Sequence, residues 1–152
     1  MHLHSPSEYT FGGSEHAAGF HLVHLKNGTT TDLLVLGLLF DTTEFGINNE
    51  LEKLWSVFRT GAATTTEKFT TSVYDLLPPN RSFTHFFGSL TTPPCTEGVK
   101  WIVMNQPCTM GRAQLEEYRD SVATAPLSKV SEFGNTNRPI QELNGRDLKT
   151  IS

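Results

Sequence analysis

The chain has 152 residues, with 12 Lys and Arg against 16 Asp and Glu. This length predicts one domain, spanning residues 1–152, that can bury a sizeable core. The slightly acidic balance and the lack of a basic run argue against nucleic acid as a partner. The longest apolar run, Leu33 to Phe40, is far shorter than the roughly 20 residues of a membrane-spanning helix and is typical of a buried strand. We therefore expect a soluble domain without a membrane span.

The first 40 residues are expected to form strands joined by turns. Gly12-Gly13 marks one turn, and Asn27-Gly28, a strong signal for a two-residue hairpin loop, marks another. The segment that begins at His2 and the segment around His21 should then pair as antiparallel strands.

Residues 48–59 change to a helical period, because apolar side chains recur on one face: Leu51, Leu54, Trp55 and Phe58. Asn48 or Asn49 can cap this helix. The threonine-rich run 61–71 lacks sustained periodicity and is expected to be a loop, with at most an edge strand.

The second half of the chain is expected to add strands before its last helix. One strand should end near Phe87, a loop should cover residues 90–94, and an apolar strand should span Val99 to Met104. Helical spacing indicates a helix within residues 106–123, and the tail after Pro126 is expected to be irregular. The fold class is mainly β: a central, mostly antiparallel twisted sheet with a few peripheral helices.

Three histidines form the first chemical signal. Successive side chains of a strand point to opposite faces, so His2 and His4 share a face, and strand pairing can bring His21 onto it. Three neutral imidazoles with an open fourth position make a catalytic zinc site. A half-buried surface pattern is the alternative, because His-x-His in a strand is often no more than that.

A downstream segment favours the metal site. Residues 87–101 read FGSLTTPPCTEGVKW, and with the histidine segments they resemble the α-class carbonic anhydrases, closest to the short microbial and fungal type. Residues 33–37 and 137–141 also look like that family's later core strand and its C-terminal motif. The resemblance covers nearly the whole chain. It implies the α-carbonic anhydrase fold and the zinc-dependent, reversible hydration of carbon dioxide to bicarbonate and a proton.

The resemblance also implies a ligand set for Zn²⁺, namely His2, His4 and His21. His24 lies three residues after His21, on the opposite face of the strand, and is expected to be a packed or hydrogen-bonded structural histidine. One residue departs from the family pattern. Gly19 stands where a glutamate usually accepts the free N–H of the third ligand, and such a loss typically costs roughly 10 to 100-fold in metal affinity or activity.

Thr91 and Glu8 resemble the family's orienting pair, in which a threonine accepts a hydrogen bond from the zinc-bound nucleophile and donates its own to a glutamate. Thr92 resembles the residue that contacts bicarbonate. Five further residues look like the wall of the carbon dioxide pocket: Val23, Val35, Leu90, Val99 and Trp101. Without the motif, Thr91 would be an ordinary turn residue and Glu8 a surface one, and any buried strand would supply such apolar residues.

The same resemblance places Met1 directly before the first ligand. We therefore expect the chain to lack the family's N-terminal segment, which includes the proton-shuttle histidine, and to be less active and less stable than a longer parent. The alternative function is an inactive or weakly active carbonic-anhydrase-like fragment or binding module. Nothing in the sequence indicates an oligomeric state.

Cysteines and sequons bear on localisation. Cys95 and Cys108 are either two buried thiols or, as the resemblance implies for Cys95, one member of a disulfide whose partner lies near the N-terminus of the family. Asn27-Gly28-Thr29 and Asn80-Arg81-Ser82 are glycosylation sequons, each a weak signal. Together these features favour a secreted parent protein.

Overall fold

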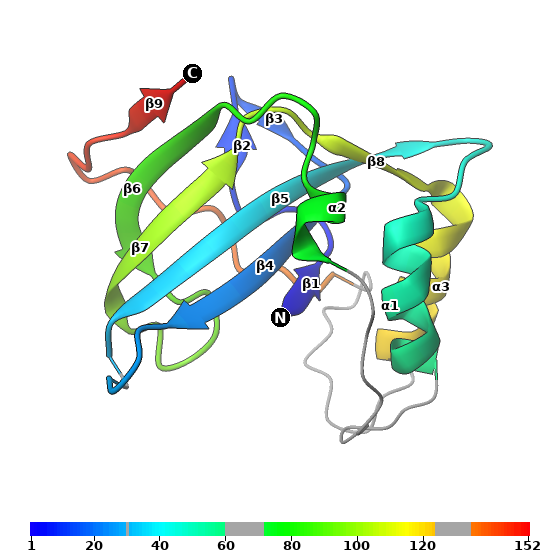
Figure 1. The fold of residues 1–152 in the computed structure, drawn as a ribbon, viewed down its shortest axis with the longest axis horizontal. Helices are drawn as coiled ribbons and strands as arrows, with labels where there is room; N and C mark the ends of the chain where they lie inside the picture. The colour runs from blue at the N-terminus through cyan, green and yellow to red at the C-terminus, as the bar shows by residue number, and fades with distance from the viewer. Residues whose placement is uncertain (30, 60–71, 124–134) are drawn as a thin grey trace.

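A twisted seven-stranded sheet forms the centre of the fold (Figure 1). The computed structural model describes residues 1–29, 31–59, 72–123 and 135–152. Across these residues the strands lie side by side in the order β1 (His2–His4), β4 (Ala18–Leu25), β5 (Leu33–Thr43), β7 (Glu97–Met104), β6 (Phe83–Ser89) and β9 (Lys149–Ile151). A seventh strand, β8 (Cys108–Gly111), also pairs with β5.

Most of the ladders are antiparallel, as predicted. β1 pairs with β4, β4 with β5, β6 with β7, and β6 with β9 in antiparallel fashion, whereas β7 and β8 both run parallel to β5. The predicted class is confirmed: the fold is mainly β, with few helices.

Both predicted turns are present, but the second is not a two-residue hairpin loop, because β4 ends at Leu25 and β5 begins at Leu33. Gly12 and Gly13, with φ angles of 57° and 80°, turn a small hairpin between β2 (Thr10–Phe11) and β3 (Ser14–Glu15). Gly28, with a φ of 80°, lies in the connection between β4 and β5. Positive φ is the region that glycine enters without a steric cost, which explains these residues at these points.

The predicted helix within residues 106–123 is wrong in its first part. Residues Cys108–Gly111 form β8, and α3 begins only at Arg112 and ends at Ala123. β8 satisfies its backbone groups by pairing with residues 40–43 of β5, and this pairing buries Met110. The tail is also more ordered than expected, because β9 pairs with β6. Residues 61–71, the predicted loop, lie outside the described residues.

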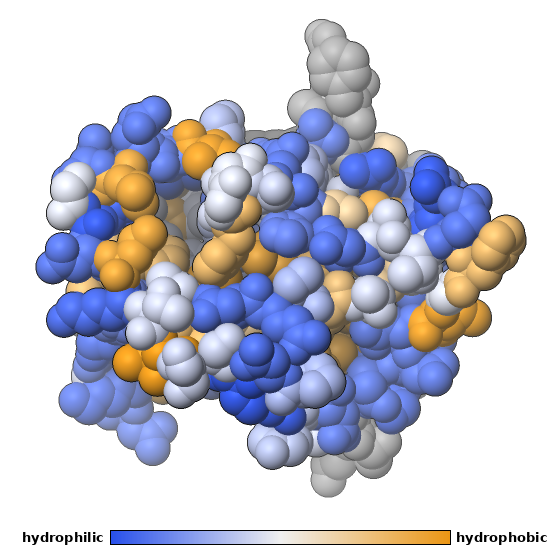
Figure 2. All heavy atoms as spheres, turned by 90° about the horizontal axis from the view of Figure 1, so that it is seen from above, coloured by the Kyte–Doolittle hydropathy of each residue, from blue (hydrophilic) through white to orange (hydrophobic). Residues whose placement is uncertain are grey.

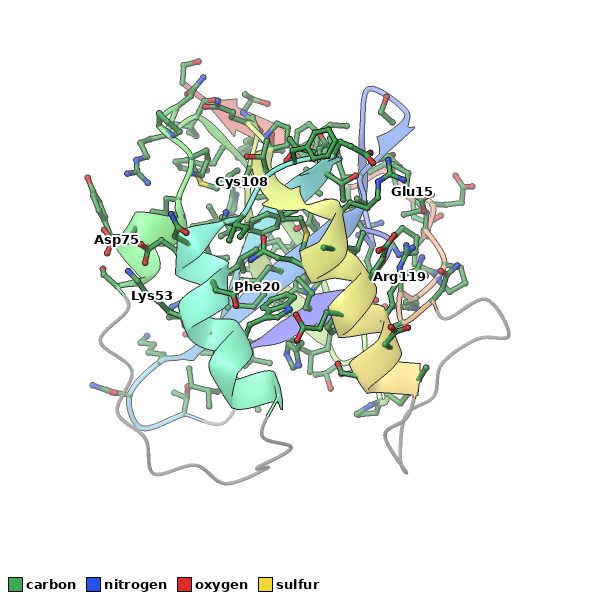
Figure 3. All side chains as sticks on the ribbon, turned by 90° about the vertical axis from the view of Figure 1, so that its right-hand side faces the viewer. Glu15, Phe20, Lys53, Asp75, Cys108 and Arg119 are labelled. Atoms are coloured by element: carbon green, nitrogen blue, oxygen red, sulfur yellow. The ribbon has the colours of Figure 1, made fainter. Side chains whose placement is uncertain are left out.

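Helices cover one face of the sheet. α1 (Asn49–Arg59) is capped as predicted, since Asn48 Oδ1 accepts the backbone N–H groups of Glu50 and Leu51. The short α2 (Val73–Leu76) begins after Ser72, whose hydroxyl accepts the N–H of Tyr74. Figure 3 shows Phe20 between α1 and α3, inside the larger apolar core. None of the described helices is long and apolar enough to cross a bilayer.

The opposite face of the sheet carries a second, smaller core. Its buried members are Val35, Leu39, Val99, Trp101 and Val103. Tyr9, Phe86 and Leu90 pack against this cluster. Figure 2 shows apolar surface at the end of the molecule where β6 and β9 lie, and exposed side chains there include Phe87, Leu148 and Ile151.

Candidate metal centre

The three histidines share one face of the sheet, as their spacing predicted. The β1–β4 register sets His2 opposite His21 and His4 opposite Gly19. The ring centroids of His4 and His21 lie 4.9 Å apart, and those of His2 and His4 lie 6.0 Å apart. His4 and His21 are buried, whereas His2, in the edge strand, is exposed.

The carboxylate of Glu8 reaches the two buried rings. Its Oε2 atom lies 3.4 Å from His4 Nε2 and 3.7 Å from His21 Nδ1, and its side chain is only 2% exposed. Among the described residues, His4, Glu8 and His21 bring their donor atoms within 4.8 Å of one another. The sequence had suggested Glu8 only as a partner for Thr91, so its approach to the imidazoles is new.

Backbone groups from the C-terminal part of the chain hold this cluster. His4 Nδ1 lies 3.1 Å from the carbonyl oxygen of Thr136, and because a carbonyl can only accept, Nδ1 carries the proton. In the neutral form of the His4 ring the lone pair is then on Nε2, the atom that faces Glu8. The backbone N–H of Arg138 donates to Glu8 Oε1 over 2.7 Å.

The atoms that face one another lack partners. Within the described residues, His4 Nε2 and Glu8 Oε2 are buried without a hydrogen bond. Burial lowers the pKa of His21 well below its usual value, and the nearby His4 and His2 lower it further, so its ring is neutral. Buried polar atoms without partners are costly, and neutral imidazole nitrogen is a preferred zinc ligand. The donor set therefore fits a zinc ion.

Comparison with known proteins identifies the family. The family model for eukaryotic-type carbonic anhydrase matches residues 1–152. The chain belongs to that family.

Similar proteins support this membership. A carbonic anhydrase from Klebsiella pneumoniae is 38% identical over 147 residues, which cover 96% of this chain and 54% of that protein. One from Neisseria gonorrhoeae is 34% identical over 148 residues, which cover 96% and 52%. The chain thus spans about half the length of the curated relatives it matches.

A solved structure agrees with the fold. The α-carbonic anhydrase of Thermovibrio ammonificans, in complex with the inhibitor sulfanilamide, superposes with a TM-score of 0.77 at 37% identity. The match covers 97% of this chain and 59% of that one. Dioscorin, at 23% identity and a TM-score of 0.74, shares the fold.

Thr91 and Glu8, the two residues predicted to orient the nucleophile, line one cavity but are not hydrogen-bonded to each other among the described residues. Thr91 is half-buried in the loop after β6, and it lines the same cavity of about 390 Å³ as Glu8. In the described part of the chain, no hydrogen bond links the two side chains. The Thr91–Glu8 bond therefore stays a prediction. Thr92 is exposed in the same loop.

The predicted pocket wall divides into buried and exposed members. Val35, Val99 and Trp101 are buried in the smaller core, and Leu90 packs against it. Val23 is 36% exposed. The indole of Trp101 meets the ring of His21 edge to face at 4.8 Å between centroids, so this wall adjoins the histidines.

His24 differs from the prediction. Its side chain is exposed and makes no hydrogen bond to a described residue, although its backbone pairs with Leu34 in the β4–β5 ladder. The two cysteines also stay separate: Cys95 and Cys108 are half-buried free thiols, and burial raises the pKa of Cys108 to about 11.

Two contributors to the centre were missed from the sequence, the carbonyl of Thr136 and the N–H of Arg138. Both act through backbone groups, which every residue carries, so no side-chain pattern marks them. The motif that contains Arg138 was noticed, and its position 130 residues from Glu8 gave no hint of the contact.

Proposed function

We propose that this chain contains the zinc-binding core of an enzyme that reversibly hydrates carbon dioxide to bicarbonate and a proton. The observation that carries the proposal is the buried convergence of His4 Nε2 and His21 Nδ1 on the sheet face that also bears His2. Family membership supports the same reaction.

His2, His4 and His21 would hold the ion, because each offers a neutral imidazole nitrogen from the same face. Zinc, when bound, makes a coordinated water acidic enough to serve as a nucleophile near neutral pH, as is established for carbonic anhydrases. The Thr136 carbonyl supports the set by fixing the tautomer of His4.

Glu8 and Thr91 would orient the reacting groups. Arg138 occupies Glu8 Oε1, which leaves Oε2 as the free acceptor on the cavity that Thr91 also lines. We infer that the Thr91 hydroxyl donates to Oε2 and thereby directs its own lone pair toward the nucleophile. Thr92 would contact bicarbonate, and the apolar side chains of Val35, Val99 and Trp101 would favour carbon dioxide over water beside the histidines.

The test is a zinc titration of the metal-free chain in competition with a chromophoric chelator, followed by stopped-flow hydration of carbon dioxide. We expect one zinc per chain and hydration that requires it. His4→Ala should abolish both. His24→Ala, an exposed histidine on the same sheet, should change neither. Zinc binding without hydration would instead favour the binding module, and no zinc binding at all would overturn the proposal.

A further inference from the structure

Two polar atoms beside the candidate centre remain unexplained. His21 Nε2 and the hydroxyl of Tyr9 are both buried, and neither has a hydrogen-bond partner within the described residues. The two rings are stacked, with centroids 5.8 Å apart and planes 21° from parallel. Both orphaned atoms therefore belong to one stacked pair. Leaving two such atoms unpaired would cost more than pairing them.

Gly19 has no side chain that could accept a hydrogen bond from His21 Nε2, the atom beside it. A β-carbon at Gly19 would lie 3.6 Å from His21 Nε2, in ordinary van der Waals contact. A longer polar side chain at this position could therefore reach the imidazole N–H of His21. Because glycine has no side chain, the chain offers nothing there from β4 itself. Another group has to supply the acceptor.

The hydroxyl of Tyr9, whose ring stacks on His21, lies beside Gly37 of the neighbouring strand β5. Gly37 faces His21 across the β4–β5 ladder, and a β-carbon at Gly37 would collide with the Tyr9 hydroxyl. Glycine at position 37 therefore lets the phenol extend beneath the ladder. Burial, and secondarily the charge of Glu8, raises the pKa of Tyr9, which keeps the hydroxyl protonated and able both to accept and to donate.

We propose that Tyr9 replaces the acceptor that Gly19 lacks, through one buried water molecule that accepts the Nε2–H of His21 and hydrogen-bonds the Tyr9 hydroxyl. A buried water is stable when it has two or more polar partners, and these two orphaned atoms are such partners. Tyr9 is then a positioning residue. It holds His21 in the tautomer that carries its proton on Nε2 and its lone pair on Nδ1, the atom that faces Glu8.

Two measurements test this inference, and only the first, zinc binding, rests on the proposed zinc site. In the zinc-binding assay, Tyr9→Phe keeps the ring but removes the hydroxyl, and it should raise the zinc dissociation constant about tenfold, the lower end of the effect of an outer hydrogen bond. In a Gly19→Glu background, the carboxylate takes the N–H directly, so Tyr9→Phe should change the constant by less than about twofold. Tyr74→Phe, which removes an exposed hydroxyl, is the matched control.

Nitrogen-15 NMR of the histidine rings supplies the second readout on the metal-free chain. We expect His21 protonated at Nε2, with slow solvent exchange of that proton, and faster exchange in Tyr9→Phe. If the chain binds no zinc, the proposed function fails while this readout still tests the bridge. An equal effect of Tyr9→Phe in both backgrounds would indicate packing alone. That result, or unchanged exchange, would overturn the inference.

Discussion

On the helix-covered face of the sheet, Phe20, Leu38 and Phe40 are completely buried among other apolar side chains. On the opposite face, His4 of β1 and His21 of β4 lie close to the buried carboxylate of Glu8. Both faces exclude water, but among the described residues the buried donors and acceptors without partners gather around the second. Unpaired buried polar atoms are tolerated where a function uses them, so the comparison favours the second face as the place of the proposed site.

The largest expected effect is a difference in the free energy of unfolding between substitutions on the two faces of the sheet. Phe20→Ala removes a fully buried ring between the helices and should lower the free energy of unfolding by about 3–5 kcal/mol. Val23→Ala, on the same strand but the other face, should cost no more than about 1 kcal/mol because Val23 is partly exposed. Urea unfolding of the metal-free chain measures both. Similar losses in the two variants would contradict the comparison.

The next effect tests whether the exposed histidine belongs to the functional face. His2→Ala and His21→Ala should each weaken zinc binding by more than the roughly 100-fold that marks the upper limit for an outer hydrogen bond. Chelator competition gives the constants, and the unfolding curve of each metal-free variant controls for folding. Retained zinc affinity in His2→Ala would mean that His4, His21 and Glu8 form the donor set instead, since these three are already gathered.

Thr91→Ala should reduce carbon dioxide hydration by about 100-fold while zinc content stays unchanged, as loss of an oriented hydrogen-bonding group does. Stopped-flow rates and metal analysis on the same sample would show this. The exposed Thr96→Ala provides a control threonine in the same loop. A rate equal to that of the parent chain would remove Thr91 from the mechanism.

The smallest effect concerns the helix-covered face. Burial raises the pKa of Cys108 to about 11 from 9.0, so above pH 9 the unfolded thiol releases its proton while the folded one keeps it. Stability from this group is therefore complete below pH 9 and is lost as pH rises toward 11. At pH 9 the loss should be at most about 0.5 kcal/mol. Urea midpoints at pH 7 and pH 9 would reveal it, and Cys108→Ser should abolish the difference.

The features predicted correctly from the sequence are those that depend on residues close together in the chain. The period of two placed His2 and His4 on one face, and Asn48 was one of two candidate helix caps, because both follow from neighbours in sequence. Prediction from local spacing failed at Cys108–Gly111, where pairing with a distant strand outweighed helical spacing. The approach of Glu8 to the histidines was equally invisible, since it depends on the path of the chain between β1 and β4.

The contacts that hold His4 and Glu8 come from residues 136 and 138, which lie 132 and 130 positions further along the chain. Contacts this distant in sequence form slowly, because a long loop must close before they contribute. During synthesis, the histidines of β1 leave the ribosome well before residues 136 and 138, which supply the backbone partners of His4 and Glu8. A nascent chain therefore passes through a period in which its imidazoles are present but unorganised. The emergence of residues 136–138, and not that of the histidines, sets the earliest moment at which the native arrangement of His4 and Glu8 can form.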